Sequence, residues 1–358
     1  MGFFMNWRKI NVLELSSVLA GPMVGDFFAE LGAKVIKIEN ALTRGDVTRS
    51  WRIPGENTPE GTSAYFLSCN HRKKSLFLNL EEKNDIQKVI DLIGKSDVVI
   101  SNFLPETGKK LKLSVAHIRK YNPQIIIVHI SGFENQPDRP AFDLAIQAET
   151  GWMHLNRNEK GEPRKLPIAF ADLITAHQAI AGTLLALLEK KPGKKGKTVK
   201  VALNTSALTA LKNLGTNQLN QSKTPKNSRE NPTLSHPNIA PYGEVFYTKN
   251  KKPFVLAIGN DRQFKALCKL LDLAHLQSDS RFTTNSLRVK NRKELEKILL
   301  RTLRKWNETE LTRKLKAAKI PFGMVRTPDA VFKRKEFPDR ILLTTKSGKR
   351  IKNRAIKI

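Results

Sequence analysis

The first half of the chain alternates strand-forming runs with helical segments, and this alternation restricts the possible folds more than any other feature. The predicted buried strands are residues 10–15, 33–39, 97–103 and 125–130. Pro22 opens the first predicted helix and Gly32 follows its end, as is usual for these two residues. Strands that alternate with helices favour a parallel sheet with helices on both faces. The sequence therefore predicts an α/β fold, with a Rossmann-like, doubly wound large domain.

A change in composition predicts a second domain. Residues 217–241 are rich in Asn, Ser, Thr, Lys and Pro, which is typical of a linker. Beyond them, two strand patterns and three helical patterns indicate a smaller α+β domain at 242–334. We expect the last segment, 335–358, to join the large domain at 1–216.

One long apolar segment, residues 168–188, contains a single carboxylate, Asp172. Its spacing and alanine content predict a buried helix. A carboxylate among apolar residues costs free energy unless it is paired, hydrogen-bonded or at a helix end. Aspartate is favoured at helix N-caps. The local sequence therefore leaves two interpretations of Asp172 open, a helix cap and a catalytic group, and the two can coexist.

The chain carries a net charge of +30, which raises the question of an anionic partner. Lysine and arginine neutralise the phosphates of nucleic acids. The basic residues are spread along the whole chain, however, and no RRM, KH, zinc-finger or helix-turn-helix pattern accompanies them. We expect no nucleic-acid partner, whereas an anionic small molecule agrees with the charge.

Other features narrow the class of protein. No apolar run approaches the length of about 20 residues that a bilayer span needs. Residues 1–9 contain no long apolar stretch, so we expect no secretory signal. We therefore expect a cytoplasmic protein with no membrane partner. Cys69 and Cys268 have no supporting cluster, so we expect reduced thiols and no metal site.

The motifs of several enzyme classes are missing. The sequence has no G-x-G-x-x-G, H-E-x-x-H, G-x-S-x-G or P-loop pattern, which argues against nicotinamide and flavin cofactors. The turn at 16–21 ends the first strand just before a helix, and free N–H groups at a helix N-terminus suit a phosphate. Glu39 ends the second strand, where it is either a ribose ligand or a solvated strand end.

Residues 12–39 strongly resemble the opening of the class III CoA-transferase family, which includes formyl-CoA transferase, carnitine CoA-transferase and the α-methylacyl-CoA racemases. Seven further segments match in the family's order. They are residues 44–49 (RGDVTR), 70–75 (NHRKKS), 97–105 (DVVISNFLP), 142–148 (FDLAIQA), 170–172 (FAD), 193–203 and 320–323 (IPFG). Ordered segments are far more specific than any single motif.

This resemblance implies a large Rossmann-like domain, a small domain, and two chains threaded through each other as an interlocked homodimer. It implies that Asp172 is the catalytic aspartate and that coenzyme A is the co-substrate. Lys73 and Lys110 would make charge-assisted contacts to CoA phosphates. The CoA contacts that the resemblance implies are Leu19, Ala20, Asn70, His71, Arg72, Lys73, Asn102, Phe103, Leu104, Lys110, Pro140, Ala141, Phe142 and Asp143.

The expected reaction moves CoA from an acyl-CoA donor to a small carboxylic acid. A model aspartate has a pKa of about 3.9, so Asp172 would be ionised and would need no general base. It would form an aspartyl mixed anhydride and then an aspartyl-CoA thioester. Residues 235–243 lack the glycine run of formyl-CoA transferase, so oxalate and formate are not expected as substrates. The sequence does not identify the two acids.

The sequence leaves two alternatives to CoA transfer. Racemisation of an α-methylacyl-CoA needs two proton-transfer groups on opposite faces of the α-carbon. Racemases carry a histidine just before the aspartate that matches Asp143, and this chain has Phe142 there, although Asp261 stands near the position of the racemases' glutamate. The other alternative is a non-catalytic basic binding protein that kept the fold, and the presence of Asp172 argues against it.

Overall fold

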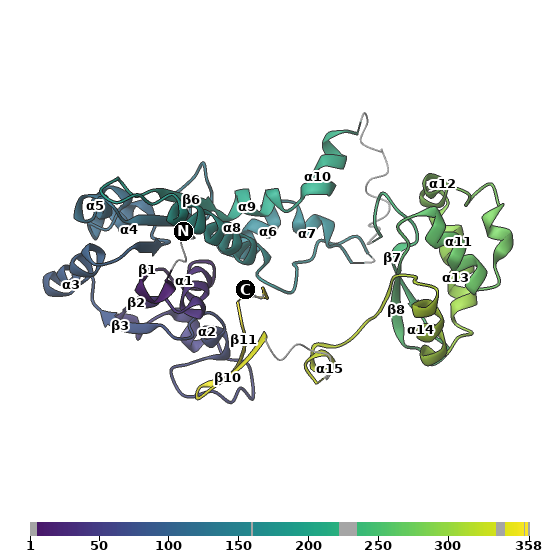
Figure 1. Cartoon of the computed structure of the whole chain (residues 1–358), viewed down its shortest axis with the longest axis horizontal. Helices are drawn as coiled ribbons and strands as arrows, with labels where there is room; N and C mark the ends of the chain where they lie inside the picture. The colour runs from purple at the N-terminus through teal and green to yellow at the C-terminus, as the bar shows by residue number, and fades with distance from the viewer. Residues whose placement is uncertain (1–5, 159, 222–234, 334–340, 354, 357–358) are drawn as a thin grey trace. The chain divides into compact units, whose positions relative to one another are not determined.

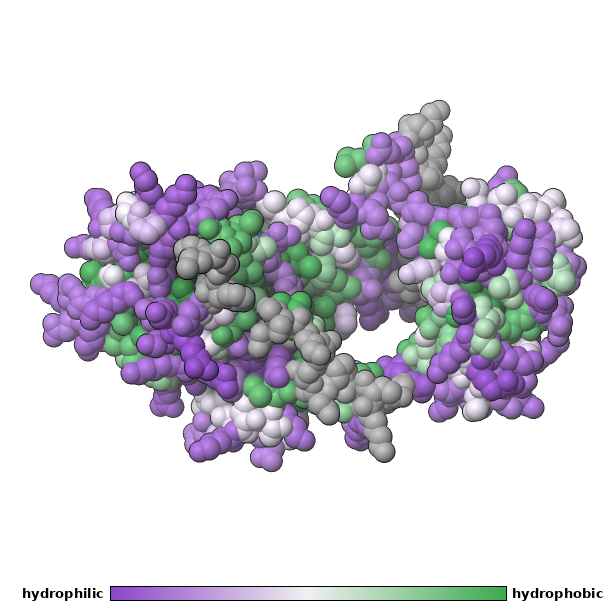
Figure 2. Space-filling model, in the orientation of Figure 1, coloured by the Kyte–Doolittle hydropathy of each residue, from purple (hydrophilic) through white to green (hydrophobic). Residues whose placement is uncertain are grey.

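The computed structural model describes residues 6–158, 160–221, 235–333, 341–353 and 355–356 (Figure 1). These residues form two compact units. Within them, the larger unit comprises 6–154, 164–221, 341–353 and 355–356, and the smaller unit comprises 155–158, 160–163 and 235–333. Hydrophilic residues cover most of the surface shown in Figure 2, in keeping with the net charge of +30.

The predicted linker and C-terminal segment are only partly described. Residues 217–219 end a helix, α10 (Lys212–Leu219), while residues 222–234 of the predicted linker lie outside the described residues. Residues 335–340, 354 and 357–358 of the predicted C-terminal segment lie outside them as well. Residues 155–158 and 160–163, which were predicted to belong to the large domain, group with the smaller unit.

A six-stranded sheet forms the centre of the larger unit, and each neighbouring pair of its strands is parallel. The strands are β1 (Asn11–Leu15), β2 (Lys34–Asn40), β3 (Lys74–Leu78), β4 (Val98–Ser101), β5 (Ile126–Ser131) and β6 (Thr198–Ala202). Their order is β3-β2-β1-β4-β5-β6, as in doubly wound folds that bind dinucleotides. The predicted α/β class with a parallel sheet is therefore confirmed.

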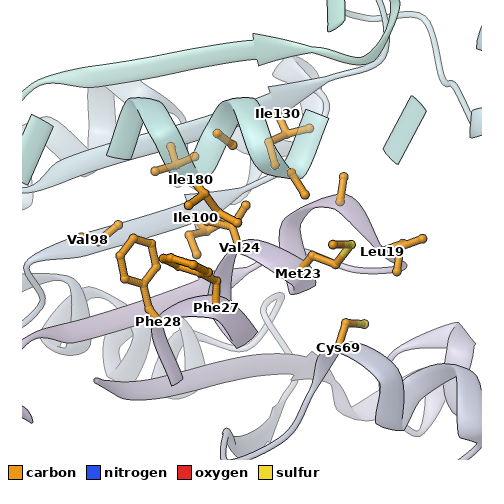
Figure 3. Packing of buried hydrophobic residues seen from close by; sticks show 14 of the residues in the cluster. Leu19, Met23, Val24, Phe27, Phe28, Cys69, Val98, Ile100, Ile130 and Ile180 are labelled. Atoms are coloured by element: carbon orange, nitrogen blue, oxygen red, sulfur yellow. The ribbon is translucent and has the colours of Figure 1, made fainter. Parts of the chain in front are cut away.

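Helices cover both faces of this sheet. Helices α1 (Ala20–Leu31) and α8 (Phe170–Leu188) pack on one face, and α3 (Lys83–Gly94) and α5 (Val115–Tyr121) pack on the other. Figure 3 shows side chains of α1 gathered beside β4 and α8. The labelled members of this cluster are Leu19, Met23, Val24, Phe27, Phe28, Cys69, Val98, Ile100, Ile130 and Ile180. Alternate residues of the buried strands enter the two cores, because successive side chains of a strand point to opposite faces.

Helix α8 is long and apolar enough, by length and composition alone, to span a bilayer. The expectation that no apolar run approaches this length is therefore wrong for this helix. Half of its most apolar stretch, 50%, is buried inside the protein, and it packs against β5, β6 and α1. A core helix that contacts a sheet and a second helix needs this composition without any membrane.

The remaining elements of the larger unit are short. They are α2 (Ala64–Cys69), α4 (Pro105–Lys110), α6 (Asp143–Glu149), α9 (Leu203–Thr209), α10, β10 (Leu342–Thr345) and β11 (Gly348–Ile351), together with α7 (Trp152–Leu155) at its boundary. Strands β10 and β11 form an antiparallel hairpin. Arg350 of this hairpin donates to both carboxylate oxygens of Asp26 on α1, at 2.7 and 2.5 Å. Asp26 also accepts the backbone N–H of His71 at 2.9 Å, so the hairpin supports the turn that follows α2.

The smaller unit is built on an antiparallel sheet in the order β7-β8-β9. Its elements are β7 (Tyr242–Tyr247), β8 (Pro253–Ala257), α11 (Asp261–Leu270), α12 (Asn285–Lys290), α13 (Arg292–Leu303), α14 (Glu308–Ala317), β9 (Phe322–Met324) and α15 (Pro328–Phe332). Arg288 is fully buried in it, pairs with Asp261 at 2.6 Å, and stacks over Phe264. Asp261 therefore has a structural partner inside this unit.

Candidate active site

The loop between β1 and α1 lies at the point where the sheet order reverses, between β1 and β4. Ligands of doubly wound sheets bind at this point, beside the carboxyl ends of the strands. Asn102, just after β4, accepts the N–H of Ser17 at 3.3 Å and donates to the Ser17 carbonyl at 3.2 Å. The two strand ends are thus tied together across the crevice.

Val18 in this loop has a φ of 73°, in the left-handed region that β-branched residues strongly avoid. Its N–H donates to Asp46 at 3.2 Å. Strain of this kind persists only where neighbouring groups impose it, and such positions concentrate at functional sites. The shape of the loop is therefore imposed by its contacts.

A buried network of four charges lies beneath the loop. The Lys37 ammonium lies 2.9 Å from Glu14 and 3.0 Å from Asp46, and it donates to the Ser16 carbonyl at 2.7 Å. The Lys73 ammonium lies 2.7 Å from the second oxygen of Glu14. Burial alone would lower the pKa of Lys37, but Glu14 and Asp46 outweigh it and raise that pKa. Two ammonium and two carboxylate groups thus balance each other in the interior.

Lys73 does not have the position that the sequence suggested. Its side chain is only 1% exposed, and its ammonium also donates to the Pro22 carbonyl and to Asn70, each at 2.8 Å. Burial lowers the pKa of this ammonium. The structure therefore does not support a charge-assisted contact from Lys73 to a CoA phosphate, because its donors serve the interior. Contact through its backbone stays a prediction.

Glu39 is not a solvated strand end. It is buried, and Arg49 binds its two oxygens at 2.7 and 2.6 Å. The Arg49 guanidinium also lies 3.8 Å from the centre of the Phe66 ring. Although burial acts to raise the pKa of Glu39, hydrogen bonds, first of all from Arg49, lower it. Through Arg49, the segment at 44–49 therefore binds the carboxyl end of β2.

Asp172 is the third residue of α8, and its carboxylate does not cap the helix. The N-cap is Ala169, which has no capping side chain. The N–H of Ala171 instead donates to Asp143 of α6 at 2.7 Å. A neighbouring helix thus supplies the cap, so the helix-cap interpretation of Asp172 is wrong, while its catalytic role stays a prediction.

Asp143 and Gln147 fix the chain that leads into α8. The Gln147 amide donates to Asp143 at 2.6 Å and to the Ile168 carbonyl at 3.1 Å, and it accepts the Leu166 N–H at 2.8 Å. Gln147 is 1% exposed. Both residues belong to the segment 142–148 that the sequence analysis matched, and their pairing with α8 gives that segment a structural reason.

The Asp172 carboxyl is largely buried, and burial is the main cause that raises its pKa to about 7. The negative charge of Asp143 raises the pKa further, and a hydrogen bond from the Ala20 backbone N–H opposes the rise. Ala20 is the first residue of α1, so the N-terminus of that helix faces the carboxylate. The expected pKa of about 3.9 is therefore wrong for this folded chain.

Two adjoining cavities open beside these groups. Asp172 lines a cavity of about 350 Å³, and a second cavity of about 630 Å³ lies at the ends of β1, β2 and β4. Both are lined by Ser17, Asn102, Phe103 and Leu104. Among the predicted CoA contacts, the structure brings together around these cavities Ala20, Asn102, Phe103, Leu104, Lys110, Pro140, Ala141 and Phe142.

The other predicted contacts do not line either cavity. They are Leu19, Asn70, His71, Arg72, Lys73 and Asp143. Leu19 is part of the core beside α1. The Asp143 carboxylate accepts hydrogen bonds from the start of α8 and from Gln147. Sequence reasoning missed Arg139, which lines the Asp172 cavity. The only available signal was a basic residue directly before the matched loop at 140–143.

The structure offers no obvious metal site in the part of the chain that it describes. No group of three or more His, Cys, Asp or Glu side chains is placed to hold a metal ion there. The two cysteines, Cys69 and Cys268, are both buried and free.

Comparison with known proteins gives a consistent result. The model of CoA-transferase family III matches residues 8–356. The chain is 32% identical over 329 residues to the succinate–glutarate CoA-transferase of Agrobacterium fabrum, covering 90% of this chain and 80% of that protein. It is 33% identical over 330 residues to the succinyl-CoA:glutarate CoA-transferase of Homo sapiens, covering 90% and 72%. A CaiB/BaiF family protein from Brucella suis has a TM-score of 0.83 at 32% identity, covering 99% and 93%.

The raised pKa of Asp172 predicts a pH-dependent cost to folding. The folded chain holds this proton more tightly than the unfolded chain, so the wild type loses stability as the pH rises from about 4 to about 7. Asp172→Asn removes that loss. We expect its melting temperature to exceed that of the wild type by a margin that grows up to about pH 7 and is constant above it.

The measurement is thermal unfolding of both proteins from pH 5 to pH 8.5. Asp91→Asn, at an exposed position on α3, controls for the loss of one negative charge. A margin that does not change with pH would contradict the raised pKa.

Proposed function

The chain belongs to CoA-transferase family III, and we propose that Asp172 is the nucleophile through which it moves CoA between an acyl-CoA and a carboxylic acid. The chain is a CoA-transferase by its family and its named relatives. The observation that carries the proposal is the placement of Asp172. Its carboxylate lies at the start of α8 and lines a cavity, while Asp143 caps the helix in its place.

The proposed reaction has two symmetrical halves. The Asp172 carboxylate attacks the donor thioester, the C–S bond breaks, and a mixed anhydride and CoA thiolate form. The thiolate attacks the Asp172 carbonyl of the anhydride, which releases the donor acid and leaves an aspartyl-CoA thioester. The acceptor carboxylate attacks this thioester, giving a new anhydride and thiolate. Attack of the thiolate on the acceptor carbonyl then forms the product and restores Asp172.

The N-terminus of α1 is the proposed site that stabilises the negative oxygen of each tetrahedral intermediate. The first N–H groups of a helix have no partner within it, and those of Ala20 and Gly21 belong to this set. A Cβ at position 21 would lie 2.3 Å from the Ser16 hydroxyl oxygen, so only glycine allows this approach. This arrangement supports a role for the N–H groups of Ala20 and Gly21 as a pair of donors to the negative oxygen that develops beside Asp172.

We place the nucleotide of CoA in the 630 Å³ cavity and its thioester end beside Asp172, because the two cavities share lining residues. Lys110 lines the larger cavity and pairs with Glu81 at 2.6 Å, with both side chains largely exposed. An exposed ion pair of this kind is weak. A phosphate could therefore replace Glu81 as the partner of Lys110 at little cost.

We propose that the acids exchanged are small dicarboxylic acids. Two relatives that are 32% and 33% identical to this chain are named for succinate or succinyl-CoA and glutarate. The cavity of about 350 Å³ beside Asp172 has the size of a short-chain substrate site. Phe142, which is 62% exposed, lines it where the racemases have histidine, and a phenyl group transfers no proton.

We also propose that the chain forms a homodimer, as the family resemblance implies. Leucine side chains on α8, α9 and α10 support this proposal. Leu185 is 60% exposed, Leu188 is 76% exposed, Leu208 is 50% exposed and Leu219 is 86% exposed. Large apolar side chains that stay this exposed support an interface with a second copy of the chain.

Substitution of Asp172 tests its proposed role as the nucleophile. Asp172→Ala should lower turnover by about three orders of magnitude or more, because the covalent route is lost. Intact-mass spectrometry of the wild type, mixed with succinyl-CoA, should detect a CoA adduct that peptide mapping assigns to Asp172. Asp91→Ala is the matched control. An adduct on another residue, or transfer that persists in Asp172→Ala, would sink the proposal.

The second prediction concerns the CoA site. Lys110→Ala should raise the KM for acyl-CoA about fivefold, corresponding to about 1 kcal/mol for an exposed charged contact, with kcat nearly unchanged. The effect should shrink at high salt. Lys109→Ala changes the adjacent exposed lysine on α4 and should leave KM unchanged. Equal effects of the two substitutions would show that only overall charge matters.

The third prediction concerns assembly. Light scattering during gel filtration should give the wild type twice the chain mass of 40.4 kDa. Leu185→Glu combined with Leu188→Glu should reduce the dimer fraction, because charge would enter the apolar contact. A wild type that stays at one chain mass at micromolar concentration would exclude the homodimer.

A further inference from the structure

The cavity beside Asp172 is lined by two charged side chains, Asp172 and Arg139. The other lining residues are neutral. The nucleophile proposed above requires no second charge for CoA transfer. A cation in the same small cavity therefore needs an explanation of its own.

Arg139 lines this cavity, and several contacts hold its side chain. Its N–H donates to the Gln136 carbonyl at 3.0 Å, and its guanidinium lies 4.0 Å from the centre of the Phe133 ring. The same guanidinium binds both carboxylate oxygens of Glu149 on α6. Stacking on a ring and pairing with a carboxylate together fix the plane of the guanidinium.

The pair between Arg139 and Glu149 is exposed, with 41% and 47% of the two side chains accessible. Exposed ion pairs contribute little to stability, so exchanging one partner costs little. Glu149 already presents the guanidinium with two carboxylate oxygens. The geometry that it occupies is the one that a substrate carboxylate would take.

We propose that Arg139 binds the distal carboxylate of a dicarboxylic acid, the group that forms no bond to Asp172 or to CoA. This inference rests on the proposed role of Asp172. When the substrate enters, its distal carboxylate displaces Glu149 from Arg139, and Glu149 turns to solvent. Arg139 is thus a specificity residue for the acid, and Glu149 is the internal carboxylate with which the acid competes.

Charge explains why this site distinguishes dicarboxylic from monocarboxylic acids. The proximal carboxylate loses its charge on forming the anhydride or thioester, but the distal carboxylate stays negative throughout. Near Asp172 and Asp143, an unpaired second carboxylate would be repelled and partly desolvated. Arg139 compensates that charge, whereas a monocarboxylic acid brings only an alkyl chain. The apolar side chains of Ile130 and Leu203 line the same cavity and suit the intervening methylene groups.

The test compares Arg139→Gln and Glu149→Gln with succinate and glutarate as acceptors, beside propionate and butyrate. Arg139→Gln should raise the KM for the dicarboxylic acids about tenfold or more, because a hydrogen-bonded charged partner is lost. It should change kcat/KM for the monocarboxylic acids by less than about twofold. Glu149→Gln should lower the KM for the dicarboxylic acids, because the competing carboxylate is gone. Arg139→Lys should restore only part of the affinity, since lysine cannot bind bidentately.

Lys120→Gln, at an exposed position on α5, controls for charge. A purely structural ion pair would make Arg139→Gln and Glu149→Gln change KM in the same direction, and that result would overturn the inference. Equal losses for both classes of acid, or a wild type that does not use dicarboxylic acids, would overturn it too. In those cases a CoA adduct on Asp172 would still show that the proposed nucleophile holds. Absence of that adduct with every acyl-CoA would refute the proposed function itself.

Discussion

The site depends on the buried charges of Glu14, Lys37, Asp46 and Lys73, which lie under the carboxyl ends of the central strands. Lys37 holds the Ser16 carbonyl, and Asp46 holds the Val18 N–H. Through these contacts the network sets the loop that leads into α1. Removing one member would leave a buried charge without its partner, which typically costs about 3–5 kcal/mol. The same network therefore stabilises the carboxyl ends of β1 and β2 and sets the geometry of the loop between β1 and α1.

Asp143 and Asp172 have different roles at the start of α8. Asp143 satisfies the N–H at the start of α8 from a neighbouring helix, so Asp172 need not. The charge of Asp143 also contributes to the raised pKa of Asp172, after burial. A carboxylate that is costly to ionise in the folded chain is reactive once ionised, because little solvent stabilises it. The N-terminus of α1, at Ala20, opposes this cost in part.

Much of the larger unit could be predicted, because the central parallel strands are continuous apolar runs such as 125–130. The edge strand β3 was missed and taken for part of a turn, since its partly exposed residues lack that signal. The short strand β9 was missed as well. Lys73 was misplaced because a lysine in a basic turn looks solvated. Its burial depends on Glu14, which is distant in sequence, and the cap that Asp143 gives to α8 is equally non-local.

The cations that line the two cavities are each paired with a carboxylate of the chain. Among the described residues that line them, Lys37 is neutralised in the interior, while Lys110 and Arg139 each pair with an exposed carboxylate, Glu81 or Glu149. An anionic substrate can then replace a carboxylate that is already present. Lys110 and Arg139 then always have an anionic partner, and the displaced glutamate becomes fully hydrated. Such exchange makes binding depend on the difference between two similar contacts, which favours affinities weak enough for both acids to enter and leave.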